Sequence, residues 1–335
     1  MDSGLLLLGL VIATAVAFDF INGFHDTANA IATVIATRVL APWQAILMAA
    51  GLNFAGALTG TAVASTIGAG LVDPHVITRG AVLAALVGAI AWNLLTWYYG
   101  IPSSSSHAIV GGMVGGAVAQ AGFDGPLWAQ IGQKTLLPFI VSPFVGFAIS
   151  VVLMIVLLNA FQRVGRRAMG AIFGRAQLLS SAFMAYSHGG NDAQKTMGII
   201  AAALVAGEVL PGGKLPIPVW VIVLSASAMA LGTAAGGWRI IRTMGTKLTH
   251  LEPVHGFAAE TAAASVIEAA SRLGFPLSTT HTIASTIMGV GAARGANYVR
   301  WNIAGNMMTA WILTIPATSA LAFLSYQLIA LTGLR

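Results

Sequence analysis

Two short stretches decide the fold: GFHDTANA at residues 23–30 and GGNDAQKT at residues 189–196. Each stretch places an aspartate, amide groups and small residues inside sequence that is otherwise apolar enough to lie in a membrane. An ionisable side chain at membrane depth is costly, so it predicts a functional site. Asp26 and Asp192 are therefore the first candidates, and the repetition of the pattern argues against chance.

The composition predicts a polytopic, all-α membrane protein. Hydrophobic residues make up 57% of the 335 residues and charged residues only 8%, whereas soluble domains have about 25% charged residues. The chain has no cysteine, which excludes disulfides and thiolate metal sites. Its net charge of +6 is better explained by basic cytoplasmic loops than by nucleic-acid binding.

Ten apolar segments flank a short basic loop, five on each side. An odd number in each half reverses the second half relative to the first, which is the condition for an inverted-topology repeat. We expect one membrane unit with a first repeat at 1–160, a short basic cytoplasmic loop at 161–177 and an inverted second repeat at 178–335. This arrangement gives ten to twelve membrane helices if broken and re-entrant ones are counted. The segments are 4–37 and 178–207, both interrupted, and 43–66, 78–99, 102–121, 135–160, 217–238, 256–273, 277–293 and 301–331.

The distribution of basic residues predicts the orientation of the chain. If both termini lie outside, ten Lys and Arg residues fall in cytoplasmic loops or at their edges. The outer side then receives four: Arg79, Lys134, Lys214 and Arg335. Because an excess of Lys and Arg marks cytoplasmic loops, we expect both termini to be outside.

A second pair of motifs, PSSSSH at 102–107 and PLSTTH at 276–281, keeps proline, hydroxyls and histidine at the same spacing. Proline disfavours helix in the residue before it, so a helix is expected to begin just after each proline. The free N–H groups at a helix start, with added hydroxyls, make an anion site. Alternatively, the hydroxyls only cap the helices or bond between them. The candidate anion ligands are Ser103, Ser104, Ser105, Ser106, Ser278, Thr279 and Thr280.

The two aspartates are accompanied by the amide side chains of Asn22, Asn29 and Asn191. Carboxylate and amide oxygens suit an alkali cation or a proton. Asp26 and Asp192 would be metal ligands only if that cation is sodium. Asp192 has an alternative, an ion pair with the lysine three residues later on the same helix face.

Four further residues are candidates for coupling or for a counter-ion role. Lys195 could hold an anionic substrate or act as an internal counter-ion. Glu260 has no basic neighbour, whereas Glu268 is expected to pair with Arg272. His107 and His281 could donate to an anion or carry a proton, or they could simply hydrogen-bond between helices.

Signatures of enzymes are missing from the sequence. It has no GxxxxGK[ST] loop and no HExxH pair, and its Ser–His spacings lack the strand-turn-helix setting of a nucleophile elbow. We therefore predict a protein that is not an enzyme and has no cofactor, with a transported Na⁺ or H⁺ as its bound ion.

Residues 23–33, 189–195, 256–260 and 274–281 together resemble the inorganic phosphate transporter (PiT) family. The resemblance implies a bacterial low-affinity phosphate permease of the inner (plasma) membrane, which imports phosphate by symport with Na⁺ or H⁺ through alternating access. It also implies inverted repeats, outward termini, a homodimer in lipid, and phosphate carried free or as a complex with a divalent metal. It places the ion-site acids at Asp26 and Asp192 and the phosphate-contacting hydroxyls within 103–106 and 278–280.

Other functions stay open at this stage. Sulfate or another tetrahedral oxyanion needs the same hydrogen-bond donors as phosphate. An anion channel would need a continuous polar pore, whereas the polar groups here gather at two symmetric places. A membrane phosphotransferase would need an activated nucleophile or a metal cluster, and neither is evident.

Overall fold

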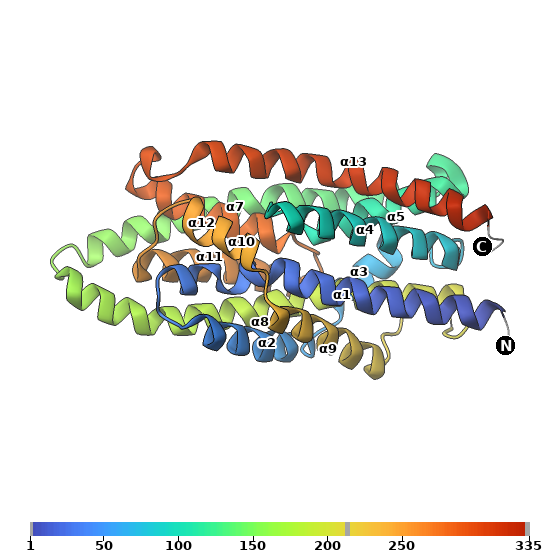
Figure 1. Ribbon diagram of the computed structural model, residues 1–335, viewed down its shortest axis with the longest axis horizontal. Helices are drawn as coiled ribbons and strands as arrows, with labels where there is room; N and C mark the ends of the chain where they lie inside the picture. The colour runs from blue at the N-terminus through green and yellow to red at the C-terminus, as the bar shows by residue number, and fades with distance from the viewer. Residues whose placement is uncertain (1–2, 212–214, 332–335) are drawn as a thin grey trace.

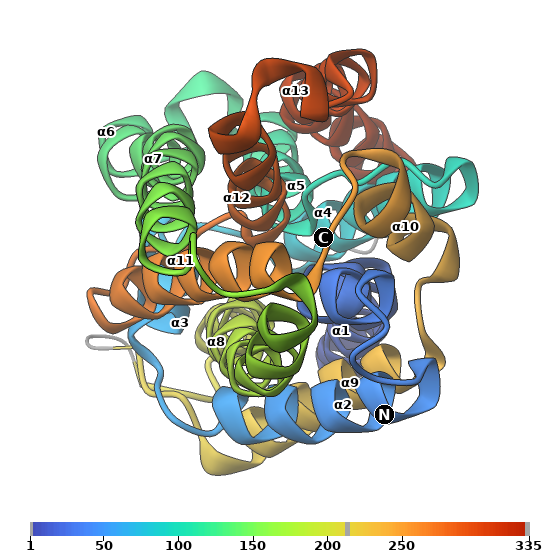
Figure 2. The ribbon, with the colours of Figure 1, turned by 90° about the vertical axis from the view of Figure 1, so that its left-hand side faces the viewer.

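The protein is a helical bundle built around two long helices that lie side by side. The computed structural model describes residues 3–211 and 215–331. Helix α1 (Ser3–Ala36) and helix α8 (Arg166–Ala206) run in opposite directions through the middle of the bundle (Figures 1 and 2). Over the described ranges the secondary structure is helical apart from two isolated β-bridges. The all-α prediction is confirmed.

Both central helices are continuous through their aspartates, so the predicted interruptions in segments 4–37 and 178–207 are wrong. The physical reason lies in the glycines, which serve close packing. A Cβ on Gly23 would collide with the backbone of Met229, and a Cβ on Gly189 would collide with the backbone of Asn53. Neither helix contains proline, so nothing removes a backbone hydrogen bond within them.

The remaining helices follow the same order in each half of the chain. Helices of one half pack on those of the other: α1 on α9, α8 on α2, α5 on α13 and α12 on α7. The first half continues with α2 (Pro42–Ala57), α3 (Ala62–Gly70), α4 (Arg79–Tyr99), α5 (Ser105–Ala121), η1 (Gly122–Asp124), α6 (Trp128–Ile131), η2 (Gly132–Leu136) and α7 (Leu137–Ala160). The second continues with α9 (Val219–Ala235), α10 (Trp238–Arg242), η3 (Thr243–Lys247), α11 (Pro253–Arg272), α12 (Thr279–Arg294), η4 (Ala296–Tyr298) and α13 (Trp301–Leu331).

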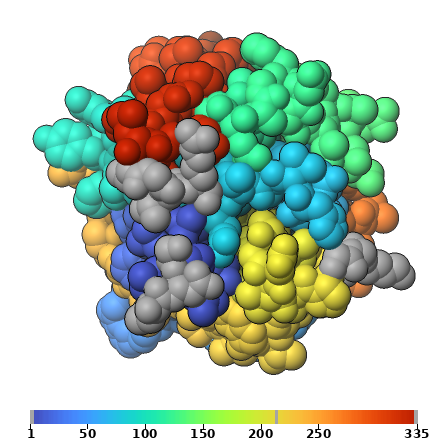
Figure 3. Space-filling view, turned by 90° about the vertical axis from the view of Figure 1, so that its right-hand side faces the viewer, coloured from blue at the N-terminus to red at the C-terminus, as the bar shows by residue number. Residues whose placement is uncertain are grey.

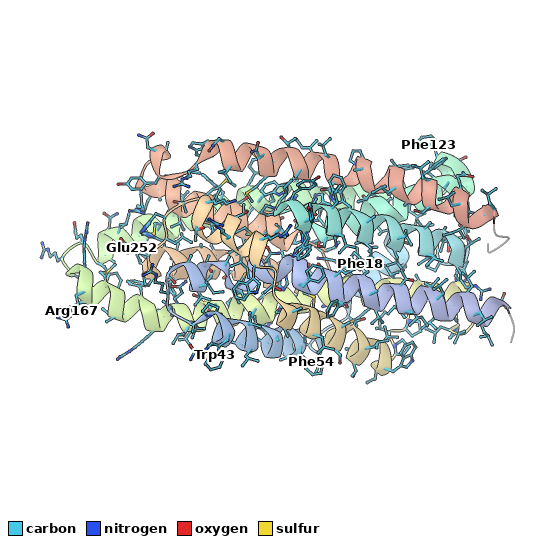
Figure 4. All side chains as sticks on the ribbon, viewed as in Figure 1. Phe18, Trp43, Phe54, Phe123, Arg167 and Glu252 are labelled. Atoms are coloured by element: carbon cyan, nitrogen blue, oxygen red, sulfur yellow. The ribbon has the colours of Figure 1, made fainter. Side chains whose placement is uncertain are left out.

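Two helical hairpins, α4–α5 and α11–α12, enter the bundle from opposite ends. The base of the first is closed by the bridge between Val72 and Pro126, and the base of the second by the bridge between Thr249 and Val299. Figure 4 shows Phe123, near the first base, and Glu252, near the second, towards opposite ends of the molecule. The segments expected as crossings at 78–99, 102–121, 256–273 and 277–293 are thus the arms of two hairpins, and of these only α4 is by itself long and apolar enough to cross a membrane among the described residues.

The hairpin tips are where the proline motifs lie. Helix α5 begins at Ser105 and helix α12 at Thr279, each three residues after its proline, so the predicted helix starts are confirmed. Gly100 and Gly274 precede the prolines with φ of 66° and 76°, a conformation that glycine adopts without steric cost. Each tip therefore reverses the chain and exposes a new helix N-terminus to the interior.

By length and composition, four helical stretches could cross a membrane: 4–36, 79–99, 128–160 and 301–331. Two bent pairs, α2 with α3 at 71° and α9 with α10 and η3 at 62°, would raise the number within the described residues to six. The bends fall near Gly60 and at Gly236–Gly237. Segments 43–66 and 217–238, expected as single spans, are therefore parts of broken ones.

The basic loop is shorter than expected. Residues 166–177 form the first turns of α8, which leaves 161–165 as the turn after α7. Figure 4 shows Arg167 at the end of the molecule opposite the start of α1 and the end of α13. At that other end, the segment around α3 lies between α13, the α6 region and the end of α8 (Figure 3). Two of the predicted outer charges, Lys214 and Arg335, lie outside the described residues.

Candidate functional site

Helices α1 and α8 carry buried polar stripes along the sides on which they pack together. On α1, Asp19, Asn22, Asp26, Asn29 and Thr33 recur at intervals of three and four, and all are buried. Residues at these intervals share one helix face. The buried polar residues of α8 include Gln177, Ser180, His188, Asn191, Asp192 and Lys195.

Asp26 and Asp192 come together with His188 in the middle of the stripes. One ligand atom from each residue lies within 4.8 Å of the other two, and all three side chains are buried. His188 Nε2 is 3.3 Å from Asp192 Oδ2. His25 Nδ1 is 2.6 Å from Asp26 Oδ1. Two carboxylates and an imidazole provide the donor atoms that a cation needs.

Lys195 connects Asp192 to both hairpin tips. Its ammonium group pairs with Asp192 and donates to the hydroxyl of Ser106 and to the carbonyl oxygen of Leu277, the last at 3.0 Å. Ser106 donates to the same carbonyl at 2.9 Å. The three contacts use the three N–H donors of the ammonium group.

The seven predicted anion-binding hydroxyls all lie buried at the two tips. Ser104 and Ser278 are N-caps, whose hydroxyls accept hydrogen bonds from the backbone N–H groups of His107 and His281 at 3.1 and 3.2 Å. These two hydroxyls stabilise the helix starts, as the alternative interpretation expected.

The second tip is held by side chains of both central helices. Asn29 Nδ2 donates to the hydroxyls of Thr279 and Thr280 at 3.2 and 2.9 Å. Thr279 donates to Asp192 Oδ2 at 3.1 Å. The second hairpin therefore contacts the residues around the aspartates directly.

The first tip leaves one hydroxyl free. Ser103 donates to Thr96 at 2.8 Å, and His25 Nε2 lies 3.0 Å from the same threonine oxygen. The buried hydroxyl of Ser105 has no hydrogen-bond partner in the described part of the chain. Since Ser105 is the first residue of α5, an anion at this helix start would meet an available hydroxyl.

The two tips meet at their histidines. The rings of His107 and His281 are 4.3 Å apart, and they stack on Phe139 and Trp311 at 4.2 and 4.0 Å. Both histidines border a mostly apolar cavity of about 580 Å³. The contact brings the N-terminal turns of α5 and α12 together.

The three predicted amide ligands differ in their surroundings. Asn191 Nδ2 donates to Ser271 at 2.7 Å, and its Oδ1 accepts from the backbone N–H of Leu277 at 3.3 Å. Both ends of this amide thus anchor the second hairpin. In contrast, the buried amide oxygens of Asn22 and Asn29 have no hydrogen-bond partner among residues 3–211 and 215–331.

Glu260 lies apart from the aspartates, at the part of the stripes formed by Thr33 of α1 and Ser180 of α8. Its carboxylate accepts hydrogen bonds from Thr33 of α1 and from Ser180 and Gln177 of α8, the last at 3.1 Å. It therefore bridges three helices by hydrogen bonds. The predicted pair of Glu268 with Arg272 is confirmed at 2.8 Å.

A model of the phosphate transporter family matches residues 22–322. The chain belongs to this family. It is therefore a multi-pass membrane transporter, as its composition and its lack of enzyme motifs predicted.

Several relatives of this family resemble the chain over nearly its whole length. A "Probable low-affinity inorganic phosphate transporter" of Rhizobium meliloti is 48% identical over 96% of each chain. One of the same name from Bacillus subtilis is 45% identical over 97% of this chain and 98% of that protein. The solved structure of "The sodium-dependent phosphate transporter" has a TM-score of 0.87 at 27% identity and covers 97% of this chain and 99% of that one.

Sequence reasoning missed two buried residues of the site, His25 and His188, and the buried Asp19 on the same stripe of α1. For Asp19, the missing signal was the period of the polar residues. Once α1 is taken as one continuous helix, the spacing from Asp19 through Asn22 to Asp26 places all three on one face. An expected break at Asp26 hid this stripe.

Proposed function

We propose that this chain imports inorganic phosphate by symport with a cation, Na⁺ or H⁺. The observation that carries the proposal is the meeting of the N-terminal turns of α5 and α12 beside Asp26, Asp192 and Lys195. Helix N-termini favour anions, and paired carboxylates favour a cation. A cation and an anion bound side by side each reduce the cost of desolvating the other.

The relatives support the choice of substrate. Two of them bear the name of inorganic phosphate transporters, and the solved structure is of a sodium-dependent one. Ser105, Thr279 and Thr280 are the hydroxyl residues that we assign to phosphate. Asp26, Asp192 and the amide oxygen of Asn29 are those that we assign to the cation.

Alternating access is the mechanism that suits this closed site. The hydroxyls of both tips are at most 2% exposed, so a bound ion would be shut off from both sides. The hairpins enter from opposite ends, and movement of either one would open the site to its own side. In this proposal, residues 1–160 and 178–335 are inverted repeats.

The surroundings of the transporter are part of the same proposal. We place it in the inner membrane with both termini outside, because the basic residues around Arg167 mark the opposite, cytoplasmic end. A homodimer in lipid, with phosphate carried free or complexed with a divalent metal, agrees with these features.

The test is phosphate uptake by Asp26→Asn in proteoliposomes. The variant keeps the shape of the side chain and removes its charge, so gradient-driven uptake should be lost while the protein elutes as the wild type does. Asp124→Asn, at the exposed last residue of η1, is the matched control and should transport normally. Wild-type uptake by Asp26→Asn would refute the assigned role.

The same vesicles test the substrate and the coupling ion. Unlabelled sulfate in excess should leave the uptake of labelled phosphate unchanged, and equal competition would show a general oxyanion transporter. A sodium gradient alone and a proton gradient alone, applied in turn, identify the ion that drives uptake.

A further inference from the structure

A cavity with basic residues in its wall lies at the base of the second hairpin. It has a volume of about 400 Å³ and is formed where the end of α7 and the start of α8 pack on α11 and α12 (Figure 2). Ligand-binding pockets measure about 300–1,000 Å³, so there is room for a small ligand. Figure 4 shows Glu252, which lines the cavity, towards the same end of the molecule as Arg167. The proposed orientation makes this the cytoplasmic end.

Two arginines line this cavity from different helices. Arg166 is the first residue of α8, and Arg294 is the last residue of α12. Neither guanidinium group forms an ion pair with a carboxylate among the described residues. Arg294 donates a long hydrogen bond, of 3.4 Å, to the carbonyl oxygen of His250, and its Cζ lies 4.3 Å from the centre of the Tyr298 ring. Most N–H donors of the two side chains are therefore available to a ligand.

His255 adds a buried donor to the same cavity. The residue is 3% exposed, and its Nδ1 accepts a hydrogen bond from the backbone N–H of Glu252 at 2.9 Å. Because an amide N–H can only donate, Nδ1 carries no proton, and the proton of the ring is on Nε2. The ring lines the cavity, and its Nε2 has no hydrogen-bond partner among residues 3–211 and 215–331. Such an unpaired donor is rare on a side chain this buried, and it favours a ligand that accepts hydrogen bonds.

The start of α11 is a further feature that favours an anion. This helix has 20 residues and begins at Pro253, which lines the cavity together with Val254. Proline has no N–H, so the first backbone donor of the helix is that of Val254. The positive end of the helix dipole adds to the attraction for an anion. The lining side chains carry one net positive charge, from two arginines, one glutamate and a neutral histidine.

We propose that this cavity binds a phosphate group and that the bound group restrains the second hairpin. Phosphate oxygens match the planar fork of a guanidinium group and also accept from imidazole and backbone N–H groups. The donors come from α8 on one side and from α11 and α12 on the other, so the bound group joins the base of the hairpin to a central helix. Two sources offer this chemistry: inorganic phosphate in the cytoplasm and the headgroup of an anionic lipid.

The restraint follows from what the tip of the same hairpin contacts. Thr279 and Thr280 hydrogen-bond to Asn29, and Thr279 also donates to Asp192. In the proposed mechanism, movement of this hairpin opens the site to its own side. A phosphate group that holds its base to α8 slows this opening. The inference rests on the proposed phosphate symport and adds a regulation to it, by which the bound anion slows uptake.

The binding test is equilibrium dialysis of radiolabelled inorganic phosphate against the purified protein in detergent. The double variant Arg166→Gln with Arg294→Gln should bind one phosphate fewer per chain than the wild type. Arg167→Gln removes a charge next to Arg166 without changing the lining of the cavity, so it should bind as the wild type does. Arg166→Lys with Arg294→Lys keeps both charges and should bind phosphate more weakly. Elution on size-exclusion chromatography shows whether each variant folds.

The lipid source is tested by native mass spectrometry of the protein taken from vesicles of phosphatidylglycerol and phosphatidylethanolamine. A phosphatidylglycerol retained by the wild type and by Arg167→Gln, but absent from the double glutamine variant, identifies the lipid headgroup as the ligand. Loss of dialysed phosphate in that variant, with no lipid retained by the wild type, identifies inorganic phosphate. Equal binding of both ligands by the wild type and the double glutamine variant would overturn the site.

Uptake of labelled phosphate tests the restraint. Vesicles loaded with phosphate, or enriched in phosphatidylglycerol if that is the ligand, should show several-fold slower initial uptake by the wild type. The double glutamine variant should lose most of this inhibition, and Arg167→Gln should keep it. The same inhibition in all three proteins would overturn the restraint. Failure of the wild type to take up phosphate under any cation gradient would instead refute the proposed function, whereas the binding results do not depend on transport.

Discussion

Replacing Lys195 with methionine would test how the centre of the bundle is held together. The substitution keeps the length and apolar volume of the side chain but removes its charge. Three contacts are lost: the ion pair with Asp192, the hydrogen bond to Ser106 and the one to the Leu277 carbonyl. All lie in the interior, where the Lys195 side chain is 2% exposed.

The expected cost follows from the burial of the remaining charge. Removing one partner of a buried ion pair destabilises a protein by about 3–5 kcal/mol, because the other charge stays desolvated. Asp192 keeps His188 and Thr279 as neighbours, so we expect the lower part of that range. Removing the second charge as well, in Lys195→Met with Asp192→Asn, should recover about 1–3 kcal/mol of coupling energy.

The measurement is a double-mutant cycle of unfolding free energies in detergent, with the two single variants and the double one. Stability of the double variant above that of Lys195→Met alone is the expected result. If the losses simply add, or if Lys195→Met costs less than about 1 kcal/mol, the ion pair is not what holds the hairpin tips to α8.

Two further predictions concern the packing and the hairpins. Gly189→Ala should destabilise the protein by about 1–3 kcal/mol, because the added methyl group would meet the backbone of Asn53. The control is Gly9→Ala, where no atom lies within 4 Å of the added methyl group and little effect is expected. Equal losses of stability in the thermal unfolding of the two variants would contradict the packing argument. Ser278→Ala removes the cap of α12 and should cost about 0.5–2 kcal/mol, with Ser278→Asn restoring most of the loss. No loss of stability in Ser278→Ala would show that the cap does not hold the tip.

The helical class and the hairpin starts were predictable because they depend on local chemistry. Pro102 and Pro276 determine where helices can begin, whatever the rest of the chain does. The pairing of Glu268 with Arg272 was likewise local, since four residues on a helix bring them together. Such features follow from a few neighbouring residues.

The continuity of α1 and α8 could not be predicted in this way. Glycine near Asp26 and Asp192 is compatible with a break and with close helix packing, and only the positions of α9 and α2 decide between the two. The convergence of His188 with Asp26 is also a tertiary fact, because the residues come from different halves of the chain. So is the contact of Asp19 with Thr196.

The most direct test of the central claim is uphill uptake of labelled phosphate by the wild-type protein in proteoliposomes. With equal phosphate inside and outside and an inward gradient of Na⁺ or H⁺, the symport account predicts accumulation above the outside concentration. Collapse of the gradient with an ionophore should release the accumulated phosphate. Entry that stops at equal concentrations under both gradients would contradict symport and indicate a passive anion pathway.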